Sequence, residues 1–125
     1  MKKVKGTAFY LLLLLCSLVL PGCSQKADDE NKSIDEIKAE AEKMDTAQLR
    51  AVAMKYKDAI MVKTGEIDKL VARLKGIAAS DKLGDEAKKL KAEIKRVTES
   101  QSALGERFVI YYNKLKEKGG DTSGL

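Results

Sequence analysis

Histidine and tryptophan are absent from this 125-residue sequence, which has one proline, two phenylalanines and four tyrosines. Without histidine the chain lacks the most common general base and metal ligand, which disfavours an enzyme. It also has no Gly-rich phosphate loop, no nucleophile elbow and no paired cysteines. Asp28, Asp29 and Glu30 lie in a polar segment where nothing would fix a metal geometry. We therefore expect no catalytic residue, metal or cofactor, and a small enzyme or metal-binding module is the least favoured function.

The charge balance gives little reason to expect nucleic acid as a partner. The formal net charge is +5, but Lys2, Lys3 and Lys5 supply three of the 24 basic residues, which leaves 21 against 19 acidic ones. A segment so close to neutrality lacks the basic surface that nucleic-acid binding requires. Charged residues make up 34% of the chain, which is typical of a helix-rich protein with much exposed surface.

Residues 1–22 have the pattern of a secretory signal peptide. Three lysines precede an apolar run over residues 8–20 that is interrupted only by Ser17. At about 1.5 Å per residue this run would span roughly 20 Å as a helix, less than the ~30 Å hydrocarbon core of a bilayer. A cleaved signal is therefore favoured over a membrane-spanning helix.

The apolar run ends in Leu20-Pro21-Gly22-Cys23, which resembles the lipobox of bacterial lipoprotein precursors. The resemblance implies that a lipid with fatty acyl chains such as palmitate is attached to the sulfur of Cys23, and that a peptidase cuts just before it. Cys16 would leave with the signal. Cys23 would then have no disulfide partner, which fits a lipid anchor better than the alternative, an ordinary free thiol. Two or three acyl chains suffice for stable membrane attachment.

Ser24 follows the proposed lipid-attachment residue. In the lipoprotein class, a serine at this place tends to direct the protein to the outer membrane of a two-membrane bacterium. The resemblance therefore implies an outer-membrane protein that faces the periplasm if the cell has two membranes. Otherwise it implies a protein on the outer face of the plasma membrane.

The mature chain is expected to be all-α, a long antiparallel coiled-coil-like hairpin with a short N-terminal helix packed at its base. Polar and acidic residues without an apolar period predict a flexible tether over residues 23–32, which the lipobox resemblance implies is lipidated at Cys23. The helical domain is expected over residues 33–120 and a disordered tail over residues 121–125. The predicted helices cover about residues 34–43, 46–78 and 85–118.

Start and stop signals support these bounds. Ser33 and Asp45 each precede a Glu or Gln three residues on, the spacing of a capping box. Gly119-Gly120 ends the last helix after a lysine-rich turn that suits the negative end of the helix dipole. Gly65 and Gly105 interrupt good helical sequence, and a break at Thr64-Gly65 is an alternative to one continuous helix.

Each long helix carries apolar residues at alternating steps of three and four, which is a heptad seam. The seam residues are Leu49, Ala53, Tyr56, Ile60, Lys63, Ile67, Leu70, Leu74 and Ile77 on one helix, and Ala87, Leu90, Ile94, Val97, Gln101, Leu104, Phe108, Tyr111 and Leu115 on the other. Folded back antiparallel, one register pairs the apolar residues throughout and sets Lys63 opposite Gln101. This match favours a hairpin closed within one chain, with the polar pair fixing the register.

An apolar strip beside the seam is expected to be covered by the helix over residues 34–43. The strip consists of Val52, Ala59 and Val62 with Gly105, Val109 and Tyr112. The short helix would cover it with Ile34, Ile37, Ala41 and Met44 and complete a three-helix base. In the alternative, the strip is an exposed interface for a second copy or another protein.

On the other flank, the same register is expected to bring Arg50 beside Lys114 and Lys57 beside Arg107. Like charges that face each other across a helix pair are mildly destabilising. We therefore consider a contact with an anion, such as phosphate-bearing lipid headgroups or another envelope polyanion, with Met54, Met61 and Ile110 close by. The alternative is that these long side chains extend into solvent.

Together these features predict a non-catalytic, lipid-anchored envelope protein that acts as a helical spacer, scaffold or binding module. Its expected partners are the membrane and a protein partner or a second copy, with no nucleic acid. A coiled-coil oligomer assembled from opened hairpins is the main alternative, since seam patterns alone do not fix the number of chains.

Overall fold

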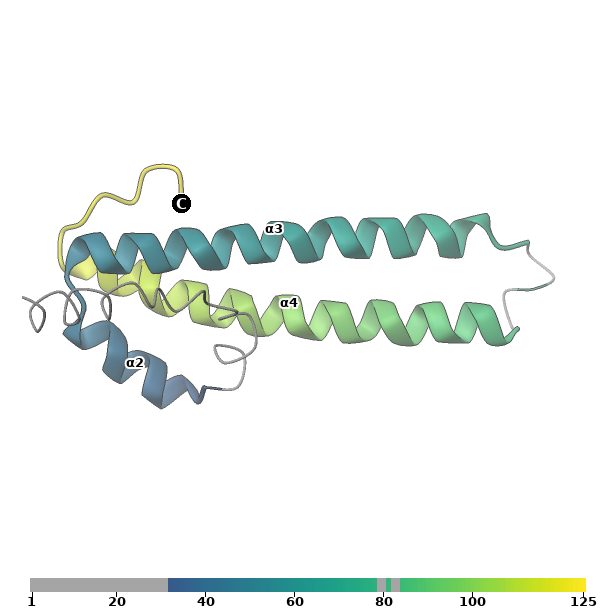
Figure 1. Cartoon of the computed structure of the whole chain (residues 1–125), viewed down its shortest axis with the longest axis horizontal. Coiled ribbons are helices and arrows are strands. Elements are labelled where there is room, and N and C mark those ends of the chain that lie inside the picture. Colours follow the sequence, from purple (N-terminus) through teal and green to yellow (C-terminus); the bar gives the residue numbers. More distant parts are fainter. Residues whose placement is uncertain (1–31, 79–80, 82–83) are drawn as a thin grey trace, which may run out of the picture.

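The computed structural model describes residues 32–78, 81 and 84–125, and in these residues the protein is a long helical hairpin with a short third helix at one end (Figure 1). The helices are α2 (Ile34–Lys43), α3 (Thr46–Gly76) and α4 (Asp85–Glu117). α3 and α4 pack antiparallel and α2 packs on α4, which confirms the expected fold class. The predicted signal, Cys23 and the tether up to residue 31 lie outside the described residues.

The starts of α2 and α3 are fixed by the capping boxes that the sequence predicted. The Ser33 hydroxyl accepts a hydrogen bond from the amide of Glu36, whose carboxylate accepts from the Ser33 amide. Asp45 and Gln48 repeat this exchange at the start of α3. Each box satisfies two amides that a helix start leaves unpaired, so these two starts are set by local sequence.

The end of α4 is closed by two hydrogen bonds across its last turn. The amide of Gly119 donates to the carbonyl of Lys116, and the amide of Gly120 donates to the carbonyl of Leu115. Gly119 has a φ of 72°, the left-handed conformation that this C-terminal motif needs and that glycine adopts without strain. α4 ends at Glu117 and α3 at Gly76, one and two residues before the predicted ends.

Two hydrophobic clusters lie along the described part of the hairpin. The basal cluster is formed where all three helices meet, by Ile37, Ala41, Leu49, Ala53, Tyr56, Leu104, Tyr111 and Leu115. The rings of Tyr56 and Tyr111 stack at its centre with centroids 5.5 Å apart. The distal cluster, Leu70, Leu90 and Val97 with partly buried neighbours, joins α3 and α4 alone. The base therefore has the larger core, and the far part is a two-helix stalk.

α3 continues through Gly65 without a break, and the polar layer of the seam lies beside it. The amide nitrogen of Gln101 donates to the Thr64 hydroxyl at 2.7 Å, one residue from the expected partner Lys63. Lys63 instead reaches Glu66 on its own helix at 3.2 Å. An ammonium gains more from a carboxylate than from a neutral amide, so Lys63 and Gln101 both contribute to a polar layer but bond to different partners.

The antiparallel register can be tested by crosslinking. Leu70 and Ile94 pack in the distal cluster, so cysteines at these two positions of an otherwise cysteine-free protein should crosslink within one chain. A Leu70/Leu115 pair is the control, because 21 helical residues separate Leu115 from Ile94, about 30 Å along α4. Gel electrophoresis distinguishes the outcomes, and crosslinks formed only between chains would support the open coiled coil instead.

Candidate functional site

The four basic residues predicted to contact an anion, Arg50, Lys57, Arg107 and Lys114, all lie near the base of the hairpin. Two of them, together with Lys118, hold α2 on α4. Arg107 is 7% exposed and donates to the carbonyls of Ala103 and Lys32, both at 2.9 Å. Lys118 donates at 2.7 Å to the carbonyls of Glu42 and Met44, which lie at the C-terminal end of α2. A cation there satisfies carbonyls that the helix leaves free and complements its dipole.

Lys114 adds a carboxylate contact between the same two helices. Its ammonium binds Glu42 of α2 and Glu117 of α4, and its side chain is only 15% exposed. The hydrogen bond that Glu42 accepts from Lys114 lowers the pKa of the Glu42 carboxyl from its ordinary 4.5. The hydrogen bonds that Lys114 donates to Glu117 and Glu42 raise the pKa of Lys114 from 10.5. The lowered carboxyl pKa makes this contact stabilising above about pH 4.5 and lost as pH falls through the lowered value. Because the pKa of Lys114 is raised, its contribution to stability is fully present below pH 10.5 and is lost only as pH rises through the raised value.

A second group of cations, on α3, holds the C-terminal segment Asp121–Leu125, which we call the strap. The two guanidinium nitrogens of Arg50 donate to the carbonyls of Asp121 at 2.6 Å and Ser123 at 2.9 Å. Lys57 donates to the carbonyl of Gly124, and Leu125 packs against the basal cluster. Bonds from the hydroxyl and amide of Ser123, and then Arg50, lower the pKa of the Asp121 carboxyl from 3.8.

The strap corrects the expectation of a disordered tail over residues 121–125. The main-chain carbonyls of Asp121, Ser123 and Gly124 accept hydrogen bonds from α3, and the one large apolar side chain, Leu125, packs in a partly buried site. In Figure 1 the strap (yellow) runs along α3 on the side of the hairpin away from α2.

The four predicted anion-contact residues therefore do not form one strip. Arg50 and Lys57 bind the strap. Arg107 instead binds the carbonyl of Lys32, two residues before α2, and Lys114 binds Glu42 of α2. The cause is geometric. In an antiparallel helix pair, the residues that directly follow a seam residue lie on one side of the pair, and the residues that directly precede a seam residue lie on the other side. Arg50 and Lys57 follow seam residues, whereas Arg107 and Lys114 precede them, so the two groups lie on opposite sides. The like-charge pairs expected across the seam are absent among these four residues.

The apolar strip divides in the same way. Val52 and Ala59 are partly buried and pack against the basal cluster, to which all three helices contribute. Val62 and Val109, however, are 60% and 50% exposed, so the expectation that α2 covers the whole strip is wrong. The short helix is ten residues long, and Val109 lines an open cleft beside it instead of being covered by it.

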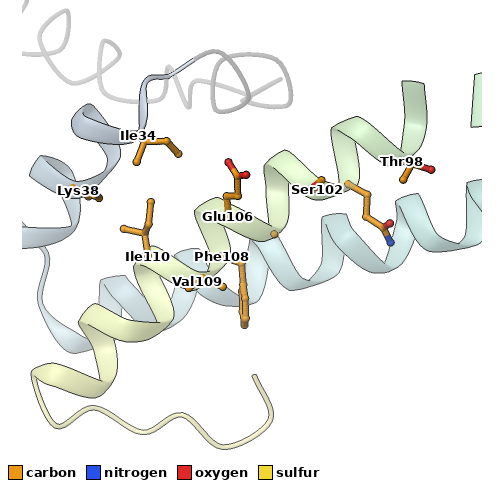
Figure 2. A pocket seen from close by; sticks show the side chains of 10 residues that line it. Ile34, Lys38, Thr98, Ser102, Glu106, Phe108, Val109 and Ile110 are labelled. Carbon is orange, nitrogen blue, oxygen red and sulfur yellow. The ribbon is translucent and has the colours of Figure 1, made fainter. Parts of the chain in front are cut away.

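A shallow cleft of about 850 Å³ opens between the start of α2 and the outer surface of α4. Figure 2 shows Ile34 of α2 and Ile110 of α4 facing one another across it. Its lining is mainly apolar or small, with Lys38 and Glu106 among the polar contributors. Such an open apolar surface suits contact with other apolar groups rather than the enclosure of a small substrate.

No protein-family model, curated protein or solved structure matches this chain. Within residues 32–78, 81 and 84–125, no helix combines the length and the apolarity needed to cross a membrane. The same described residues hold no group of three or more cysteine, aspartate or glutamate side chains placed to bind a metal ion.

Proposed function

We propose that this protein is a lipid-anchored, non-catalytic component of the bacterial cell envelope that acts as a helical spacer. The observation that carries the proposal is the Leu20-Pro21-Gly22-Cys23 pattern after an apolar run too short to span a bilayer. Lipid on Cys23 fixes the mature chain to a membrane at its first residue. Ser24 favours the outer membrane in a two-membrane cell.

The geometry of the hairpin supports the spacer role. The chain that leads from Cys23 joins the fold at the base, where the Lys32 ammonium binds Glu40 at 2.8 Å and the Lys32 carbonyl accepts from Arg107. The end of α3 and the start of α4 lie at the opposite end of the hairpin (Figure 1). Arg107 follows the first residue of α4 by 22 residues, about 33 Å along the helix, so a chain anchored through Lys32 would hold the far end of the hairpin roughly that far from this point.

A role as a scaffold or binding module is favoured by the exposed apolar residues at the base. Val62, Val109 and the lining of the cleft are available for contact with a second copy or another envelope protein. A spacer that positions such a surface combines both roles.

The lipid anchor is tested by metabolic labelling with a fatty acid in cells that express the full chain. We expect the wild type to incorporate the label and to fractionate with membranes, and Cys23→Ser to do neither, because the thioether cannot form. Cys16→Ser is the matched control and should label normally. Equal labelling of wild type and Cys23→Ser would contradict the lipoprotein proposal.

A further inference from the structure

A stripe of alternating cations and methionines runs along one face of α3 at the base. Arg50, Met54, Lys57 and Met61 follow one another at steps of four, three and four residues, which places them on one side of a helix. Met54 and Met61 are 36% and 54% exposed, among the most exposed large apolar side chains described. Cations interleaved with exposed flexible apolar side chains form the pattern that suits an anionic membrane interface.

The two cations of this stripe are occupied by weak internal partners. Four contacts hold the strap to them: three are to neutral main-chain carbonyls, and the fourth is the Asp121 carboxylate at 3.5 Å from Arg50. Both the Arg50 and the Asp121 side chains are partly exposed, at 35% and 67%. A phosphate oxygen carries negative charge and a main-chain carbonyl carries none, so the attraction of a cation to phosphate is stronger and lipid phosphates can compete for these positions.

We infer that the stripe of Arg50, Met54, Lys57 and Met61 is a contact surface for an anionic phospholipid bilayer, and that the strap covers its cations until it is displaced. The inference rests on the proposed function in one respect, since a lipid on Cys23 brings the base near the membrane. Displacement of the strap exposes two cations at once and moves the Asp121 carboxylate away, so the face becomes more basic when it opens.

The expected gain in membrane affinity follows from the number of cations that the strap covers. A basic residue near an anionic leaflet contributes about 1 kcal/mol, which corresponds to roughly fivefold in affinity. Release of Arg50 and Lys57 together should therefore strengthen binding to an anionic surface by roughly 30-fold at low salt. Added salt should reduce the gain, because exposed charges are screened over about 10 Å at 0.1 M.

The experiment measures binding of the unlipidated protein, residues 24–125, which contains every described helix and both clusters, to phosphatidylcholine vesicles with and without phosphatidylglycerol. A stop after Gly120 removes the strap and should raise binding to the phosphatidylglycerol vesicles only. Leu125→Ser keeps the charge of the strap but weakens its docking, and should give a smaller gain. Circular dichroism confirms that each variant remains helical.

Charge reversal identifies the surface. In the strap-less protein, Arg50→Glu with Lys57→Glu should abolish the gain, whereas Lys69→Glu with Lys75→Glu, an equal change of charge towards the turn, should preserve most of it. The inference is overturned if strap removal leaves anionic binding unchanged, or if both double variants lower it equally. Because no lipid is attached, failure here leaves the fatty-acid labelling result unaffected, and the two proposals fail separately.

Discussion

Leu115→Ala should destabilise the protein by about 2–5 kcal/mol, the range for truncating a fully buried leucine. Leu115 is 0% exposed and belongs to the basal cluster, in which Ile37 of α2 and Leu49 of α3 are also fully buried. Its carbonyl accepts the hydrogen bond that closes the end of α4. The cavity would therefore open where the three helices meet, and there is little neighbouring core to collapse into it.

Thermal and urea unfolding followed by circular dichroism measure this effect. For a domain of this size, each 1 kcal/mol corresponds to roughly 4–8 °C in Tm. Met61→Ala is the matched control, since methionine is similar in size and Met61 is 54% exposed, so the change should stay within about 0.5 kcal/mol. Equal loss of stability in the two variants would show that the basal cluster is not the cooperative core.

The features that the sequence predicted well are those encoded locally. Heptad spacing places Leu49, Tyr56 and Leu115 on the buried faces of their helices whatever else the chain does, and all three are buried. The capping boxes at Ser33 and Asp45 depend on residues three positions apart. Periodicity and capping are short-range properties, so they survive in the folded protein unchanged.

The arrangement around the seam was harder to predict because it depends on contacts between distant residues. Arg50 donates to main-chain carbonyls 71 and 73 residues further along the chain. Every residue has such a carbonyl, so the sequence does not indicate which one will accept the bond. Arg107 has no acidic residue three or four positions away on its own helix, and it donates to the carbonyls of Ala103 and Lys32. Unpaired cations in a sequence can thus mark main-chain acceptors as well as ligands.

Gly120→Ala should destabilise the fold by about 1–3 kcal/mol, as expected for inserting a methyl group into a packed site. A Cβ at Gly120 would lie 2.1 Å from a terminal methyl carbon of Leu115 and 3.1 Å from the Cβ of Thr46. Leu115 is fully buried and Thr46 begins α3, so neither can move aside without disturbing the basal cluster. The strap begins at the next residue, so its docking should weaken as well.

Gly65→Ala is the control with the opposite sign. Nothing lies within 4 Å of a Cβ built at Gly65, which is inside α3, so alanine should stabilise the helix by up to about 1 kcal/mol. Both variants add one methyl group to a glycine, and only the surroundings differ. Urea unfolding of the two proteins measures the difference directly. If Gly120→Ala were neutral or stabilising, the close approach of Gly120 to Leu115 and Thr46 would be wrong, and the strap would have no fixed starting point at the base.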